Sequence, residues 1–179
     1  MGTRGRTEPF DILISEKAIQ ERIVALGAEI DRDLKDGDLV VVGVLKGSFV
    51  FMADLIRAIK RPVSCDFIRV ASYDHDHSTG VVRLEFDLTQ PIADKSVLLI
   101  EDIVDTGRTL RFLLKYLQAK RPARIRVASL LYKEINPEVR GFIDYCGFTV
   151  PDKYVVGYGL DSEGLYRSLP HIGCRAEER

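Results

Sequence analysis

The segment VLLIEDIVDTGRTL, residues 97–110, combines residue types whose spacing suits ligand chemistry. Glu101 and Asp102 are adjacent carboxylates at the end of an apolar run, and Asp105 follows three residues later. Gly107 permits backbone angles at which successive N–H groups converge on one point, and the start of a helix adds positive potential. Together these features predict a phosphate cradle beside acidic groups.

The carboxylates beside this cradle cannot bind phosphate directly. They suit sugar hydroxyls, or a divalent cation that bridges to phosphate, so the segment favours a phosphorylated sugar as ligand. The alternative is a strand, a tight turn and an N-capped helix without a ligand, which leaves the crowding of three acids unexplained. The segment lacks the glycine and lysine spacing of a P-loop, and Gly157-Tyr158-Gly159 lacks the third glycine of a dinucleotide-binding loop.

Hydrophobic periodicity predicts the elements that position these residues. We expect a helix capped by Ser15, with Ile19, Ile23, Leu26, Ile30 and Leu34 at helical spacing, helices at 49–60 and 109–119, and strands at 39–45, 63–70, 81–88, 96–100, 125–131 and 154–158. Strands that alternate with helices predict an α/β fold with a central, mostly parallel sheet flanked by helices. In such sheets ligands bind beyond the carboxyl ends of the strands, where the predicted cradle lies.

Composition limits the classes of partner. The chain of 179 residues is expected to form a single domain, and 26 Lys and Arg residues against 27 Asp and Glu residues give a net charge of −1. This balance argues against binding nucleic acid or an anionic membrane through bulk positive charge, without excluding a focused anion site. Cys65, Cys146 and Cys174 are far apart and form no disulfide or zinc pattern, so a reducing cytoplasm is the simplest setting.

Residues 97–110 also resemble the phosphoribosyl-pyrophosphate signature of type I phosphoribosyltransferases. The rest of the chain narrows the resemblance to the 6-oxopurine members, the hypoxanthine-guanine phosphoribosyltransferases. The tetrapeptide LKGS at 45–48 follows the first buried strand, where that family has its pyrophosphate loop, and residues 127–133 and 151–161 resemble its purine-binding strand and its hood. The resemblance extends over residues 12–173.

This resemblance implies a reaction. The 5-phosphoribosyl group of phosphoribosyl pyrophosphate is transferred to hypoxanthine or guanine, which yields IMP or GMP and pyrophosphate in purine salvage, with Mg²⁺ as cofactor. It also implies a type I phosphoribosyltransferase fold, here 1–179, with a small hood formed by about residues 1–20 and 150–179. A homo-oligomer, dimer or tetramer, is expected, with the first sheet-flanking helices at its interface. No nucleic acid or membrane partner is expected.

The resemblance assigns roles around the sugar. Glu101 and Asp102 would hold the ribose hydroxyls and the adjacent Mg²⁺, and Asp105 would accept the proton from purine N7. The 5′-phosphate would lie in the loop of Asp105, Thr106, Gly107, Arg108 and Thr109. The Arg108 side chain either adds a contact to the phosphate or faces solvent.

The resemblance also assigns roles around the base and the leaving group. Lys133 would donate to the exocyclic O6 and disfavour adenine, which presents an amino donor there. Tyr154 would stack on the purine, and Val155 would offer its backbone to the base edge. Asp161 would hold a second Mg²⁺ or its water, and Arg167 would bind the leaving pyrophosphate.

Two segments carry further expectations. In this family the peptide at Leu45-Lys46 is often cis, which would turn the Lys46 and Gly47 N–H groups toward pyrophosphate. Ser72 and Tyr73 would close a lid that keeps water from the reactive sugar. The following stretch, residues 74–77 (DHDH), departs from the family's usual forms and is compatible with a solvated loop or a metal site.

Two other functions remain open. An RNA-binding regulator with this fold needs a basic face, which the net charge and the purine set of Lys133, Tyr154 and Asp161 argue against. A phosphoribosyltransferase for another base is the second alternative. Adenine is disfavoured by Lys133, whereas xanthine is not excluded, because its discrimination rests on backbone carbonyls near C2.

Overall fold

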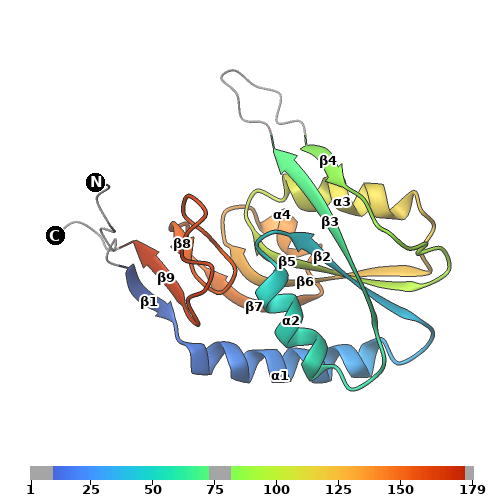
Figure 1. Cartoon of the computed structure of the whole chain (residues 1–179), viewed down its shortest axis with the longest axis horizontal. Coiled ribbons are helices and arrows are strands. Elements are labelled where there is room, and N and C mark those ends of the chain that lie inside the picture. The colour runs from blue at the N-terminus through green and yellow to red at the C-terminus, as the bar shows by residue number, and fades with distance from the viewer. Residues whose placement is uncertain (1–9, 73–81, 176–179) are drawn as a thin grey trace, which may run out of the picture.

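The computed structural model describes residues 10–72 and 82–175 of the chain (Figure 1). Its elements in chain order are β1 (Phe10–Ile14), α1 (Glu16–Asp33), β2 (Leu39–Leu45), α2 (Phe49–Ala58), β3 (Ser64–Ser72), β4 (Val82–Phe86), β5 (Ser96–Val104), α3 (Arg108–Gln118), β6 (Arg124–Lys133), α4 (Pro137–Arg140), β7 (Tyr145–Val150), β8 (Val155–Val156) and β9 (Ile172–Arg175). Within these ranges no helix is long and apolar enough to cross a membrane.

Six strands form the central sheet, in the order β4-β3-β2-β5-β6-β7. Neighbouring strands are parallel except β3 and β4, which are antiparallel. This arrangement confirms the predicted α/β fold with a mostly parallel sheet. The chain leads from β2 to β3 on one side and from β5 to β6 on the other, so the strand order reverses between β2 and β5.

Apolar side chains cover both faces of the sheet. Successive residues of β2 point to opposite faces, so Val41 joins the cluster with Ile30 of α1 and Leu55 of α2, while Val40 joins the cluster with Leu113 of α3. Figure 1 shows α1 and α2 on one side of the sheet and α3 on the other. Burial on both faces explains why β2 is an uninterrupted apolar run rather than an alternating one.

A second, smaller sheet joins the two ends of the described chain. Its strands are antiparallel in the order β1-β9-β8, so β9 lies between β1 and β8 (Figure 1). Ser15 follows β1 and caps α1 as predicted, because its hydroxyl accepts a hydrogen bond from the Ala18 N–H at 3.3 Å. The cap fixes where the chain leaves the small sheet and enters the first helix.

The helix predicted at 49–60 is too long, because α2 ends at Ala58. Ile59 takes an extended conformation, with φ −77° and ψ 126°. The next N–H, that of Lys60, donates to the Asp31 carboxylate of α1 at 2.9 Å instead of to the helix. A tertiary contact therefore ends this helix.

Two strand predictions also need correction. The strand expected at 154–158 shrinks to β8, because Gly157 and Tyr158 have φ of 98° and 50° and turn the chain away from its partner. The strand expected at 96–100 continues to Val104, still paired with β6. Sequence periodicity missed β1, β7, β9 and α4, whereas the remaining predicted strands and the helix at 109–119 match within two residues.

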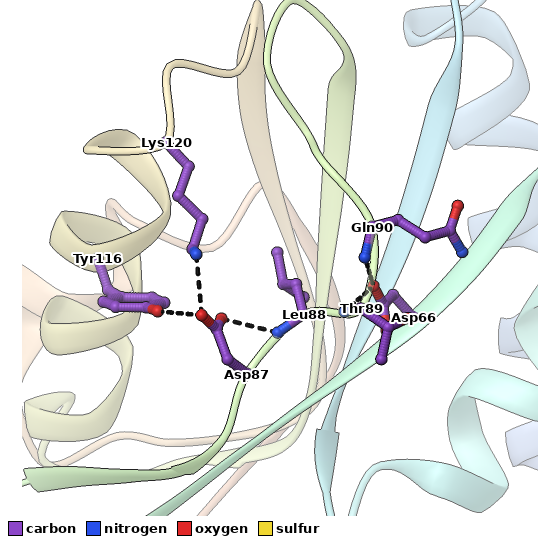
Figure 2. Close-up of polar contacts among 7 residues, drawn as sticks. All are labelled: Asp66, Asp87, Leu88, Thr89, Gln90, Tyr116 and Lys120. Atoms are coloured by element: carbon purple, nitrogen blue, oxygen red, sulfur yellow. Dashed lines mark hydrogen bonds and ion pairs between the residues drawn. The ribbon is translucent and has the colours of Figure 1, made fainter.

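The connection between β4 and β5 is tied to the fold by two aspartates (Figure 2). Asp66 of β3 is buried and accepts the backbone N–H groups of Thr89 and Gln90 at 2.8 and 3.1 Å. Asp87 accepts the Tyr116 hydroxyl of α3 at 2.5 Å. Lys120 donates to the same Asp87 oxygen at 2.9 Å, so the segment after β4 is bound to the helix that follows β5.

Candidate active site

The carboxyl ends of β2 and β5 lie side by side where the strand order reverses, which is the usual ligand position in such sheets. A cavity of about 450 Å³ opens there and is lined by Val44, Leu45, Lys46, Gly47, Val70, Glu101, Asp102, Ile103, Thr109, Asp161 and Arg167. Predicted site residues from three distant segments therefore share one cavity. The Leu45–Lys46 peptide bond at its edge is cis.

Two adjacent carboxylates belong to β5 itself rather than to the loop after it. Burial raises the pKa of Glu101 well above its ordinary value of 4.5, and the charge of Asp102 raises it further. Burial likewise raises the pKa of Asp102 to about 6, although backbone N–H groups and the Arg167 charge oppose the shift. Burial disfavours the charged form of both carboxylates. Acidic residues with such raised pKa values, at a strand end that opens into a cavity, are candidates for a functional site.

Asp161 and Arg167 form one wall of the cavity. The Arg167 guanidinium contacts the Asp161 carboxylate at 2.6 Å and donates to the Gly159 carbonyl at 2.5 Å. The Gly164 N–H donates to the other Asp161 oxygen at 2.7 Å. These contacts hold Arg167 over the cavity with its charge balanced by a neighbouring carboxylate.

The loop between β5 and α3 encloses a second, smaller cavity. Residues 103–110 line it together with Glu101, and its volume is about 90 Å³. Gly107 caps α3 with φ 75°, and a Cβ there would overlap the Val139 side chain. Only glycine suits both the left-handed backbone and the close contact. The predicted phosphate cradle is thus a preformed loop at a helix N-terminus, with Arg108 exposed at the start of α3.

Lys133 lies beside Asp105, the first residue of this loop. It is the last residue of β6 rather than a residue beyond the strand, and its side chain is 13% exposed. Its ammonium lies 3.7 Å from the Asp105 carboxylate and 3.0 Å from the Asp152 carboxylate. The structure therefore brings together Lys133 and Asp105, which were both predicted, with Asp152, which was not.

The other two residues expected to contact the base lie at the start of β8, where Tyr154 precedes the strand and Val155 is its first residue. Tyr154 is 52% exposed, and its hydroxyl donates to the Asp161 carbonyl at 3.2 Å. Val155 is buried and pairs with Cys174 of β9. The small sheet therefore holds this segment against the site.

Two glycines let backbone segments meet at the cavity. A Cβ at Gly47 would overlap the Asp102 carboxylate, and a Cβ at Gly159 would overlap the Gly47 carbonyl oxygen. Gly159 also has φ 103°. We call Glu101 and Asp102 the acidic pair. The loop after β2 is consequently in direct contact with Asp102 of this pair and with the turn after β8. Gly159 is not among the predicted site residues, and its close contact with Gly47 becomes visible only in the structure.

The carboxylates that line the cavity suit Mg²⁺ in part. Over the described ranges, no three carboxylate, imidazole or thiol groups gather into a metal site. Mg²⁺ usually takes one or two carboxylates together with waters and substrate phosphates, and the neighbours Glu101 and Asp102 fit that set. A cation beside them would also offset the cost of burying two carboxylates. The Asp161 carboxylate is already engaged by Arg167 and Gly164, so it requires rearrangement to act as a ligand.

Some predicted residues lie outside the described ranges. Tyr73 and the stretch 74–77 are among them, and Ser72 enters only as the last residue of β3. Asp152 gave no signal in sequence because its partner is 19 residues away and its role depends on how the chain folds back after β7.

The fold and the site define an α/β enzyme that binds its ligand at the carboxyl ends of parallel strands. A family model described as "phosphoribosyl transferase domain" matches residues 11–163. The hypoxanthine-guanine phosphoribosyltransferase of Dictyostelium discoideum is 44% identical over 94% of this chain and 96% of its own length. That of Staphylococcus epidermidis is 45% identical over 94% of each chain.

A solved structure agrees with these relatives. The crystal structure of a hypoxanthine phosphoribosyltransferase from Staphylococcus aureus superposes with a TM-score of 0.89 at 40% identity, over 98% of this chain and 96% of that one. The chain belongs to the phosphoribosyltransferase family and, within it, to the hypoxanthine-guanine phosphoribosyltransferases.

Proposed function

We propose that this protein transfers the 5-phosphoribosyl group from phosphoribosyl pyrophosphate to hypoxanthine or guanine, yielding IMP or GMP and pyrophosphate in purine salvage. The observation that carries the proposal is the shared cavity at the ends of β2 and β5, which combines the acidic pair, Arg167 and the loop after β2 beside the phosphate cradle. The curated relatives named hypoxanthine-guanine phosphoribosyltransferase support the choice of base.

The reaction exchanges one bond at the anomeric carbon of the sugar. Purine N9 bonds to this carbon while the bond to the pyrophosphate oxygen breaks, and pyrophosphate leaves with the electron pair. The proton on purine N7 passes to the Asp105 carboxylate, which acts as general base. Asp105 is half-exposed at the mouth of the phosphate loop, so its carboxylate is within reach of a base bound above the sugar.

The sugar and its 5′-phosphate bind at the end of β5. The backbone N–H groups of Thr106, Gly107, Arg108 and Thr109 wrap the phosphate at the N-terminus of α3, where the helix dipole favours an anion. Glu101 and Asp102 accept hydrogen bonds from the ribose hydroxyls. The phosphate loop and the acidic pair thus fix both ends of the sugar, and the anomeric carbon is oriented for attack.

The leaving group binds across the cavity. Arg167 donates to the pyrophosphate oxygens with its planar guanidinium, and the N–H groups of Lys46 and Gly47 meet it from the loop after β2. A Mg²⁺ ion held by Glu101 and Asp102, and a second held by Asp161 or its water, would neutralise charge on the departing pyrophosphate. For Asp161 to serve in this way, Arg167 would have to turn from Asp161 toward the substrate.

The base binds between the end of β6 and the segment before β8. Lys133 donates to O6 of hypoxanthine or guanine, and the exposed ring of Tyr154 stacks on the purine face. Val155 binds the base edge through its backbone. Adenine presents an amino group to Lys133, so two donors would face each other and binding would lose that hydrogen bond.

We extend the proposal to the setting and the assembly. Residues 1–179 form one domain, with a hood made of about residues 1–20 and 150–179. Cys65, Cys146 and Cys174 are free, which supports a reducing cytoplasm as the setting. We place the interface of the expected homo-oligomer on α1 and α2, where Val24 and Phe49 are 67% and 44% exposed. Light scattering of the purified protein tests this, and a monomer would contradict it.

A base panel tests the activity. Purified protein is incubated with phosphoribosyl pyrophosphate, Mg²⁺ and, separately, hypoxanthine, guanine, xanthine, adenine and uracil, and the nucleotide products are separated by chromatography. We expect IMP and GMP, and no AMP or UMP. A folded protein that makes no IMP or GMP overturns the proposal, and efficient AMP formation overturns the role of Lys133. A parallel reaction with EDTA is expected to stop, and excess Mg²⁺ is expected to restore it.

A further inference from the structure

Lys133 lies between two carboxylates that come from different parts of the chain. Asp105 belongs to the loop after β5, whereas Asp152 belongs to the connection between β7 and β8. The ammonium is within hydrogen-bond distance of Asp152, at 3.0 Å, but at 3.7 Å it is too far from Asp105 for a hydrogen bond. The cation is therefore held closer to Asp152 than to the proposed general base.

This position matters because an ammonium has three N–H donors and no acceptor. One donor of Lys133 is directed to Asp152, which leaves donors for a purine O6. Among the described residues, the other carboxylate within 4 Å of this nearly buried cation is that of Asp105, which would attract it once Asp152 is uncharged. If the Lys133 ammonium moved into hydrogen-bond contact with Asp105, it would use a donor that O6 needs. It would also occupy the Asp105 oxygen that accepts the N7 proton.

From these contacts we propose that Asp152 is a positioning residue. It holds the Lys133 ammonium away from Asp105, so that Lys133 remains available to the 6-oxo group and Asp105 remains available to the N7 proton. This inference rests on the proposed function. It adds a residue that contacts neither sugar nor phosphate and that acts on the base only through Lys133.

The exposure of Asp152 separates this role from a structural one. Its side chain is 67% exposed, and the nearly buried Lys133 keeps the Asp105 carboxylate as a partner, so loss of the Asp152 charge should change the free energy of unfolding little. We therefore expect Asp152→Asn to leave the thermal midpoint of unfolding nearly unchanged. Kinetics rather than stability should report the loss of this contact.

The kinetic test varies each substrate in turn. Asp152→Asn is expected to lower kcat/KM for hypoxanthine about fivefold to tenfold, on the scale of one uncharged hydrogen bond, because the amide keeps an acceptor but loses the charge. KM for phosphoribosyl pyrophosphate should stay within about twofold, because the variant leaves the phosphate and pyrophosphate contacts intact. Asp152→Glu, which keeps the charge, should recover most of the loss.

Glu21→Gln is the matched control. Glu21 is 69% exposed and pairs with one lysine, Lys17, at 3.8 Å on α1, so the change removes a similar exposed charge from a helix that does not line the cavity. It is expected to match the wild type in every kinetic parameter. A loss of the same size in this variant would mean that Asp152→Asn acts through net charge, which would overturn the positioning role.

A double-mutant cycle tests whether Asp152 acts through Lys133. In a Lys133→Met background, Asp152→Asn should cause no further loss with hypoxanthine. The same loss in both backgrounds would overturn the inference, as would an Asp152→Asn enzyme with wild-type kinetics. A wild-type enzyme that turns over no 6-oxopurine instead overturns the proposed function, so the two failures are distinguishable.

Discussion

The Lys133 ammonium lies 3.7 Å from the Asp105 carboxylate, at the carboxyl ends of the paired strands β6 and β5. A 6-oxopurine presents N7 and O6 side by side on one edge. A cationic donor and an anionic proton acceptor at this spacing would match that edge, with the donor facing O6 and the acceptor facing the N7 proton. In the proposed function this pair links the chemistry of the transfer to the choice of base.

Asp105→Asn should remove the proton acceptor while keeping the size of the side chain. We expect kcat to fall about 10²–10⁴-fold, the usual range for a general base. The dissociation constant of IMP, measured by calorimetry, should change only a few-fold. Equal losses in turnover and in IMP affinity would mean that Asp105 binds the nucleotide rather than moving a proton.

Lys133→Met should remove the donor to O6 and keep most of the apolar stem. We expect kcat/KM for hypoxanthine to fall about tenfold or more, with a smaller change in the KM of phosphoribosyl pyrophosphate. Initial rates with each substrate varied at saturating levels of the other measure both. Discrimination against adenine should weaken, and unchanged discrimination would contradict the assigned role of Lys133.

Gly47→Ala should disturb the close contact between Gly47 and the Asp102 carboxylate in the cavity. The added Cβ overlaps the Asp102 carboxylate, so either the loop after β2 or the acidic pair must shift. Such overpacking typically costs ~1–3 kcal/mol, and we expect kcat/KM for phosphoribosyl pyrophosphate to fall at least tenfold.

Gly141→Ala is the control for this change. The nearest atom to its added Cβ is the Glu138 carbonyl oxygen at 3.6 Å, an ordinary contact, so this variant should behave as the wild type. Wild-type kinetics in Gly47→Ala would show that the contact between Gly47 and Asp102 is not needed.

The Asp87 cluster makes stability depend on pH (Figure 2). Burial raises the pKa of Asp87, but hydrogen bonds from Tyr116, Lys120 and the Leu88 N–H together lower it below the ordinary value of 3.8. The unfolded chain then binds more protons than the native state as the pH falls below 3.8, so the stabilisation from Asp87 is complete above that pH and is lost below it.

Urea unfolding of the wild type and of Asp87→Asn at a series of pH values measures this effect. The wild type should be the more stable protein at pH 6–7, and the difference should shrink as the pH falls below 3.8. A difference that stays constant down to pH 2.5 would show that the charge of Asp87 is not the stabilising feature.

Local signals were sufficient to predict part of the fold. The apolar run of β2 predicted its bounds, since a strand buried on both faces needs no alternation. Ser15 was predicted as a cap because its hydroxyl acts on an N–H three residues away. In contrast, β1 and β9 stabilise each other from opposite ends of the chain, so no local pattern marks either strand.

In the site, too, features with a local signal were predicted, and features that depend on distant segments were not. Residues 105–109 were predicted from their own spacing, and the structure has them as a short loop and the start of α3 around a small cavity. The extension of β5 through Glu101 and Asp102 was not predicted, because periodicity does not indicate that two carboxylates will be buried in a strand. The contact of Asp152 with Lys133 requires β6, β7 and the following turn to be folded, so only the structure reveals it.

The most direct test of the account is the product balance of a single reaction. Purified protein with Mg²⁺, hypoxanthine and excess phosphoribosyl pyrophosphate is sampled over time, and IMP and pyrophosphate are quantified together. We predict that the two products form in a one-to-one ratio and that hypoxanthine disappears at the same rate. Release of pyrophosphate without IMP, or no turnover by a folded protein, would contradict phosphoribosyl transfer to the 6-oxopurine as the function of this site.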